Sequence, residues 1–156
     1  MQYNQYKFKF YLNANHMIYL DGVSGQNHPH TWEIAINTLK IVDGFIQFND
    51  VEKAVDGLLS AYQDVSLNDV EPFNFTNPTV ENLCEFFKNE IRILLRKNGW
   101  VLLTIEVSET PTRSYIIDIS DEIDDEILAI SPEKSKAIET IAEEKLSEIL
   151  KENGKN

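Results

Sequence analysis

Two stretches of the chain predict a pair of strands at its centre. They are Phe8-Lys9-Phe10-Tyr11-Leu12-Asn13-Ala14-Asn15-His16 and, after a polar loop, His28-Pro29-His30. The first stretch alternates apolar and polar side chains, which predicts a half-buried β-strand ending near His16. His28 and His30 stand two residues apart, so on a strand both imidazoles leave the same face. If these two strands pair, all three side chains converge.

Three neutral imidazoles with an open fourth position are the ligand set of a catalytic zinc ion. An isolated His-X-His would favour the alternative, in which histidines lie close together on the surface by chance. Because His16, His28 and His30 are all the histidines in the chain, we favour a Zn²⁺ site.

Length, composition and charge limit the class of protein. A chain of 156 residues with 42% hydrophobic side chains suits one domain with a real core. No apolar stretch approaches the ~18 residues of a membrane span, and the N-terminus lacks the features of a signal peptide. Cys84 is the single cysteine, so a cytoplasmic location is expected. The net charge of −12 disfavours binding to nucleic acid.

Hydrophobic patterning predicts four main strands and two helices. Residues 5–14 and 30–41 alternate as strands; Asp43-Gly44 predicts a turn and residues 45–48 a short strand, after which Asn49 can cap a helix. Thr79 can cap a second helix that Gly99 ends, and Cys84 lies on its apolar side as a small core residue. Strands at 100–107 and 114–117 complete an α+β domain, an antiparallel four-stranded sheet with both helices on one face. The apolar stripes are Val51, Val55, Leu58, Leu59 and Tyr62 in the first helix and Leu83, Phe87, Ile91, Leu94 and Leu95 in the second.

An acidic extension follows this domain, which we divide into residues 1–118 and 119–156. Ser131-Pro132-Glu133 is typical of a helix start. The helix carries one apolar stripe, made of Ile138, Ile141, Ala142, Leu146, Ile149 and Leu150. We expect this stripe to pack on the outside of an assembly or against a neighbouring subunit.

Five motifs occur in a fixed order: Phe10 to His16, His28-Pro29-His30, Leu67-Asn68, Asn77-Pro78-Thr79-Val80-Glu81-Asn82 and Ser108-Glu109-Thr110. Together they resemble the family of 6-pyruvoyl-tetrahydropterin synthase and 6-carboxy-tetrahydropterin synthase, the latter an enzyme of the queuosine pathway. The resemblance covers about residues 5–117 and implies the tunnelling fold, in which three subunits join their sheets into a barrel and two trimers stack into a hexamer. It also implies zinc on the three histidines, lyase chemistry, and a pterin anchored by Glu109 and Thr110.

The sequence departs from the family at the positions that move protons. Ser24 stands where the family has its cysteine, and Gln63-Asp64 where it has its catalytic Asp-His pair. A serine hydroxyl cannot be tuned into a base as a thiol or imidazole can, and a carboxylate has a different reach. Ser24 and Asp64 are therefore the substituted catalytic positions. Gln47 replaces the aspartate before the first helix, and Pro29 replaces the glycine between the zinc histidines.

Three functions remain open. The first is a zinc-dependent tetrahydropterin synthase with weak or altered activity on 7,8-dihydroneopterin triphosphate, in which Asp64 or a zinc-bound hydroxide serves as base. The second is a catalytically silent member that binds a pterin or guanine nucleotide as a sensor or partner subunit, since guanine offers Glu109 the same N–H edge. The third, a structural oligomer stapled by zinc, does not require Glu109 and is disfavoured.

Overall fold

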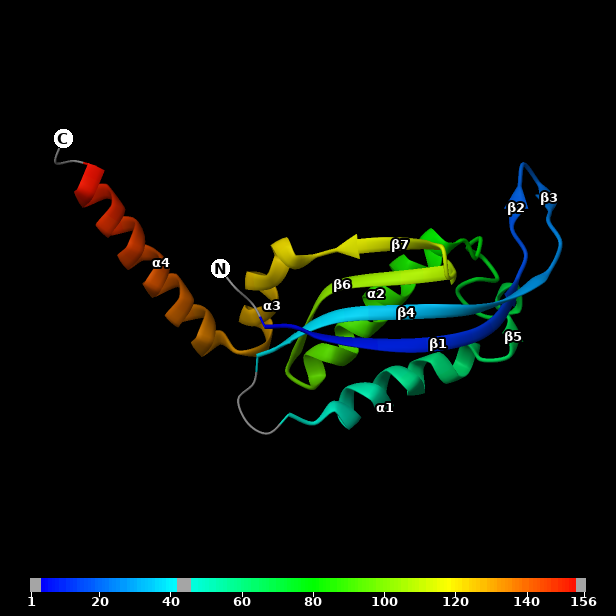
Figure 1. Ribbon diagram of the computed structural model, residues 1–156, viewed down its shortest axis with the longest axis horizontal. Coiled ribbons are helices and arrows are strands. Elements are labelled where there is room, and N and C mark those ends of the chain that lie inside the picture. Colours follow the sequence, from blue (N-terminus) through cyan, green and yellow to red (C-terminus); the bar gives the residue numbers. More distant parts are fainter. Residues whose placement is uncertain (1–3, 42–45, 154–156) are drawn as a thin grey trace.

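The computed structural model describes residues 4–41 and 46–153 (Figure 1). A five-stranded sheet of order β5-β1-β4-β6-β7 forms its centre. The strands are β1 Tyr6–His16, β2 Tyr19–Leu20, β3 Val23–Ser24, β4 His28–Lys40, β5 Val65–Ser66, β6 Trp100–Thr110 and β7 Arg113–Asp118. The helices are α1 Phe48–Leu59, α2 Val80–Lys97, α3 Ile123–Ile130 and α4 Pro132–Asn153, with 3₁₀ turns at Ser60–Tyr62, Leu67–Asp69 and Ser120–Glu122.

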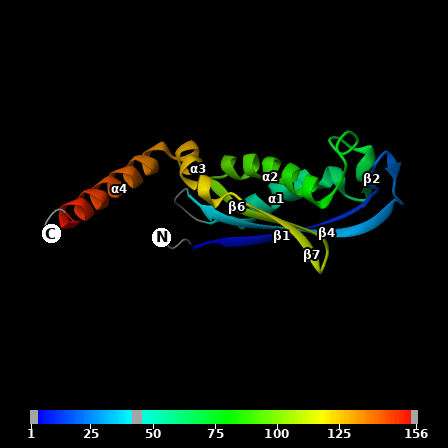
Figure 2. The same cartoon turned by 90° about the horizontal axis from the view of Figure 1, so that it is seen from above.

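The strands β1 and β4 pair as the alternation predicted. Their antiparallel register sets His16 opposite His28 and Ala14 opposite His30. Helices α1 and α2 cover one face of the sheet, as expected, and the described chain places no helix on the opposite face (Figure 2). The α+β architecture is therefore confirmed, with β5 as a fifth, two-residue strand parallel to β1.

The main core lies between the sheet and these two helices. Every second residue of β1 from Phe8 to Ala14 is buried there. Thr79 caps α2 as predicted, since its Oγ1 accepts from the Asn82 amide at 3.2 Å, and Gly99 follows the helix with a φ of +76°. Cys84 is fully buried in this core, as expected. The side chains that form the core are mostly Phe, Leu, Ile, Val and Trp, so hydrophobic burial holds the sheet and helices together.

Two details at the start of α1 differ from the prediction. Ile46 and Gln47 form no strand, and Phe48 is the first helical residue; Asp43, Gly44 and Phe45 lie outside the described residues. The residue at the cap position is Gln47, not Asn49, and its side chain makes no capping hydrogen bond. Phe48 instead packs its ring edge-on against Tyr6 and Phe8, so tertiary packing starts this helix two residues earlier than the capping signal indicated.

The strand β6 changes face partway along. The register with β4 shifts at Asn37/Thr38, so Leu103 has no partner, a β-bulge. Beyond this bulge, Ile105 and Val107 enter the main core, whereas Val101 and Leu103 join a second core cluster with Ile41, Ile123 and Ile127. Strict alternation along β6 would place Val101, Leu103, Ile105 and Val107 on one face, but the bulge divides them between the two core clusters.

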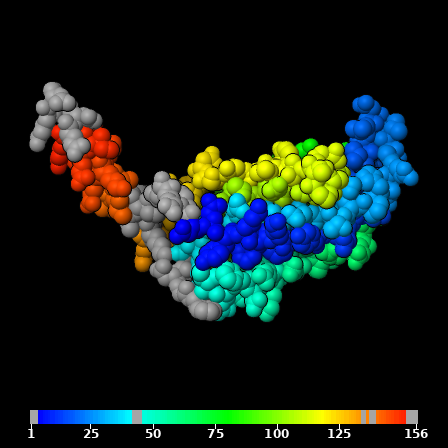
Figure 3. Space-filling view, in the orientation of Figure 1, coloured from blue at the N-terminus to red at the C-terminus, as the bar shows by residue number. Residues whose placement is uncertain are grey.

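The extension beyond residue 118 forms two helices. Helix α3, which the patterning did not predict, covers the second core cluster and is tied to α2 by Glu126, buried between Arg92 and Arg96. Helix α4 begins at Pro132 as predicted, extends away from the body of the molecule, and contacts chiefly α3 (Figure 3). Ile141, Leu146, Ile149 and Leu150 are exposed on it, each by at least half; the side chain of Ile138 is not among those described. No helix in the described part of the chain has the length and apolarity to cross a bilayer.

Candidate metal centre

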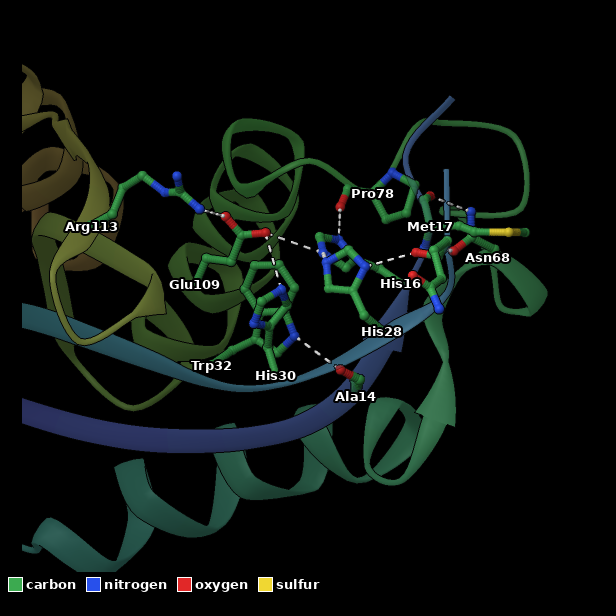
Figure 4. Close-up of polar contacts among 11 residues, drawn as sticks. Ala14, His16, Met17, His28, His30, Trp32, Asn68, Pro78, Glu109 and Arg113 are labelled. Carbon is green, nitrogen blue, oxygen red and sulfur yellow. Dashed lines mark hydrogen bonds and ion pairs between the residues drawn. The ribbon is translucent and has the colours of Figure 1, made fainter. Parts of the chain in front are cut away.

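The register of β1 and β4 brings the three histidines together at one end of the sheet (Figure 4). The Nε2 atoms of His16 and His28 are 2.9 Å apart, and Glu109 Oε1 lies 3.1 Å from His16 Nε2 and 3.3 Å from His30 Nε2. The four ligand atoms lie within 4.8 Å of one another, and the group could hold a metal ion. The predicted convergence is confirmed, and Glu109 joins it.

Two of the histidines are fixed in one tautomer by backbone carbonyls. His16 Nδ1 lies 2.8 Å from the carbonyl oxygen of Pro78, and His28 Nδ1 lies 2.7 Å from that of Gln26. A carbonyl oxygen can only accept, so each Nδ1 carries the proton and donates it. In the neutral rings each Nε2 then presents a lone pair to the centre of the cluster, as in metal-binding histidines whose other ring nitrogen donates to a carbonyl.

This arrangement fits a cation better than it fits hydrogen bonding within the cluster. Two lone pairs 2.9 Å apart repel unless a proton or a cation lies between them. A single proton can bridge only two of the atoms in the cluster. In addition, the buried atom His30 Nε2 has no hydrogen-bond partner among the described residues. A divalent ion would satisfy all three nitrogens and the carboxylate oxygen at once.

The protonation of the rings suits the same role. Burial lowers the pKa of His16, outweighing the Pro78 hydrogen bond and the Glu109 charge that would raise it. Burial also lowers the pKa of His30 in spite of Glu109. Both imidazoles are therefore neutral near pH 7, the form that binds metal.

Several motif residues position His16 rather than touch a ligand. The Asn68 side chain accepts from the Met17 amide at 2.8 Å and donates to the Met17 carbonyl at 2.9 Å, which fixes the end of β1. The Asn77 side chain likewise accepts from the Tyr19 amide and donates to the Tyr19 carbonyl. Pro78, the next residue, supplies the carbonyl that orients His16. Sequence reasoning identified these motifs only through the resemblance and did not predict their roles, because every contact spans about fifty residues or more.

The substituted catalytic positions, Ser24 and Asp64, have exposed side chains. Ser24 is exposed on β3, in the β2–β3 hairpin that projects from the end of the sheet (Figure 1). Asp64 is exposed, adopts a φ of +58°, and donates its amide to the Asn13 carbonyl. Gln63 bridges the edge of β1, accepting from the Asn13 amide at 3.0 Å and donating to the Tyr11 carbonyl at 2.8 Å.

Two cavities adjoin the cluster and share the segment Pro29-His30-Thr31. One, of about 480 Å³, has Glu109 and Thr110 in its wall with Tyr11 and Glu33. The other, of about 500 Å³, has Asp64 in its wall. Both volumes fall in the range of small-molecule sites. His30 thus lines both cavities, one together with Glu109 and Thr110 and the other together with Asp64.

Comparisons with known proteins agree on the fold. Residues 5–121 match the sequence profile of the family described as 6-pyruvoyl tetrahydropterin synthase. A search of curated proteins finds no match.

Solved structures repeat the architecture at low sequence identity. The Caenorhabditis elegans 6-pyruvoyl tetrahydropterin synthase is 17% identical with a TM-score of 0.64, over 76% of this chain and 96% of that one. The Plasmodium falciparum enzyme is 15% identical with a TM-score of 0.53, over 72% and 96%. An uncharacterized Wolinella succinogenes protein is 11% identical with a TM-score of 0.57, over 74% and 98%. Since the family profile spans most of the chain, this protein belongs to the 6-pyruvoyl tetrahydropterin synthase family.

Proposed function

We propose that the protein binds zinc on His16, His28 and His30 and binds a pterin of the dihydroneopterin triphosphate type beside it, with weak or altered lyase activity. The observation that carries this proposal is the cluster of inward lone pairs next to a cavity containing Glu109 and Thr110. A bound zinc would act as a Lewis acid toward vicinal oxygens of the ligand.

Ligand recognition is assigned to Glu109 and Thr110. The Glu109 side chain is only 14% exposed, so a carboxylate hydrogen bond to a ligand N–H there is little weakened by water. A carboxylate accepts two parallel N–H bonds from the 2-amino and ring N–H edge of a pterin. Guanine offers the same edge, so this feature selects a chemical shape.

Weak catalysis is proposed because Ser24 and Gln63-Asp64 stand where the family has its cysteine and its Asp-His pair. Cys84 cannot replace the missing thiol, since it is fully buried in the core and burial raises its pKa to about 12. Gln63 is committed to the β1 backbone, and Ser24 is exposed on a projecting hairpin. Asp64, on the neighbouring cavity, is the remaining candidate base. General acid–base groups typically contribute ~10²–10⁴-fold each, so turnover should be low.

The second candidate is a catalytically silent sensor or partner subunit that binds a pterin or guanine nucleotide. It is favoured by the use of Gln63 as a structural bridge, because a residue bonded to Tyr11 and Asn13 is not free to assist proton transfer. Both candidates share the zinc and the Glu109 site and differ only in turnover.

Assembly into a trimer or hexamer, in the cytoplasm, is part of the proposal. Strand β7 is an edge of the sheet with Tyr115 and Ile116 exposed by 38% and 58%. On the other side, β5 pairs with β1 only at Ala14 and Asn15. Edges of this kind are removed when neighbouring subunits continue the sheet.

Two measurements test the function. Metal analysis should find one zinc per chain in the wild type and little in a His28→Ala His30→Ala variant; equal zinc in both would remove the site. The zinc-loaded protein should convert 7,8-dihydroneopterin triphosphate weakly or not at all. Robust turnover would overturn the weak-activity proposal, and its loss in Asp64→Asn would then identify Asp64 as the base. Binding of the compound without turnover would favour the silent alternative.

A further inference from the structure

The proposed function assigns the Glu109 carboxylate to the pterin, but in the structure this carboxylate lies against the histidines (Figure 4). We propose that Glu109 is the fourth metal ligand of the ligand-free protein and that Arg113 holds it there, so that the site is closed until a ligand displaces the carboxylate. This inference rests on the proposed zinc site.

The backbone aims Glu109 at the cluster. Between β6 and β7, Ser108 pairs with Ser114 and Thr110 with Arg113, so Glu109 is left without a partner in the ladder. Such a bulge bends the strand and redirects a side chain. Glu109 lies near the end of β6, two residues beyond the buried Val107, and its carboxylate lies against His16 and His30.

Glu109 Oε1 is close enough to two histidines to share a metal ion with them. It lies 3.1 Å from His16 Nε2 and 3.3 Å from His30 Nε2. The ligand atoms of all four residues lie within 4.8 Å of one another, so the carboxylate would be one of four protein ligands to a bound metal ion.

Arg113 engages the second carboxylate oxygen. Its terminal nitrogen lies 2.8 Å from Glu109 Oε2, and its side chain is 66% exposed, whereas that of Glu109 is 14% exposed. Both oxygens of Glu109 are therefore occupied. A pterin edge would use the same two oxygens, so a bound ligand would compete with Arg113 and the metal for the Glu109 carboxylate.

A metal-free ion pair is the competing explanation. It would require His16 or His30 to be protonated on Nε2, and one proton cannot satisfy two nitrogens and the His28 nitrogen beside them. Arg113 already neutralises the carboxylate, which removes the need for an imidazolium partner.

Cobalt(II) provides the test, because its visible absorption reports coordination without any turnover. Wild-type protein loaded with Co²⁺ should show a four-coordinate spectrum that azide leaves unchanged. In Glu109→Gln and Glu109→Ala a solvent position opens, so azide should shift the spectrum and metal affinity should fall. Arg113→Ala should lower metal affinity by ~10–100-fold, the usual effect of losing an outer partner, and Arg113→Lys should restore part of it.

Glu106→Gln is the matched control. Glu106 is on the same strand, but its carboxylate accepts from the Ser114 hydroxyl and lies outside the cluster. Its substitution should therefore leave the Co²⁺ affinity and the spectrum unchanged. If wild type and Glu109 variants bind Co²⁺ equally well and respond equally to azide, the fourth-ligand inference is overturned while the three-histidine site stands. If wild type binds no more Co²⁺ than His28→Ala His30→Ala, the proposed function itself fails.

Discussion

Replacing Glu126 with glutamine should destabilise the protein by removing the charge that ties α3 to α2. The Glu126 side chain is 1% exposed, and its carboxylate accepts from Arg92 Nε at 2.6 Å and Arg96 Nε at 2.5 Å. Breaking a buried ion pair by removing one partner costs ~3–5 kcal/mol. The Arg92 and Arg96 side chains are 20% and 39% exposed, so water can solvate them in part when the Glu126 charge is removed. We therefore expect the free energy of unfolding to fall by ~2–3 kcal/mol.

The destabilisation by Glu126→Gln can be compared with the free energy that apolar burial contributes to the docking of α3. Ile123 and Ile127 are each 6% exposed in the second core cluster, and a fully buried isoleucine contributes ~1.5–3 kcal/mol. A loss of ~2–3 kcal/mol therefore weakens this docking without abolishing it. Urea unfolding should report the change in unfolding free energy, and hydrogen exchange should localise the loss of protection to the α3 amides.

The effect should depend on pH with a definite sign. Burial alone would raise the pKa of Glu126, but the hydrogen bonds from Arg96 and Arg92 outweigh it and leave that pKa below its ordinary value. A carboxyl with a lowered folded-state pKa stabilises the fold above its unfolded pKa, about 4.3, and this contribution is lost as pH falls through the folded value. The gap between wild type and Glu126→Gln should narrow from pH 6 to pH 3.

A matched control is Glu122→Gln, since Glu122 contacts Arg92 at 2.6 Å but is 46% exposed. Its substitution should cost less than ~1 kcal/mol. A Glu126→Gln effect no larger than that of the control, or one unchanged between pH 6 and pH 3, would refute the reasoning.

Three other outcomes are expected. Truncation after Ile130 should lower the mass of the assembly or its melting temperature and leave zinc content intact, because we expect the exposed stripe of α4 to pack against a neighbouring subunit; unchanged mass and melting temperature would contradict this. The Cys84 thiol, whose pKa burial raises to about 12, should react with Ellman's reagent at pH 8 only after unfolding; rapid reaction in the native protein would contradict its burial. Light scattering should find a trimer or hexamer at micromolar concentration, and a stable monomer would count against closure of the sheet edges.

Much of the candidate site could be predicted because it follows from local pattern. The alternation from Phe8 to His16 and the two-residue spacing of His28 and His30 put their imidazoles on one side of a sheet whatever surrounds them. Thr79 and Gly99 marked the ends of α2 through the chemistry of their own side chains and backbones. The helix at Pro132 followed from the same kind of signal.

The parts that could not be predicted depend on register and on distant backbone atoms. A bulge at Leu103 separated Val101 from the main core, and a second bulge interrupts the β6–β7 ladder at Glu109. Neither has a residue pattern of its own. The carbonyls of Pro78 and Gln26 set the histidine tautomers, and every residue has a carbonyl, so the sequence does not distinguish these two.

The strands, the two core helices, the convergence of the three histidines and, through the motifs, the family could all be inferred from the sequence. The contacts of Glu109 with His16, His30 and Arg113 could be seen only in the folded chain. The physical reason is that side-chain periodicity fixes which face of an element is apolar, whereas strand register and packing fix which atoms of separate elements meet.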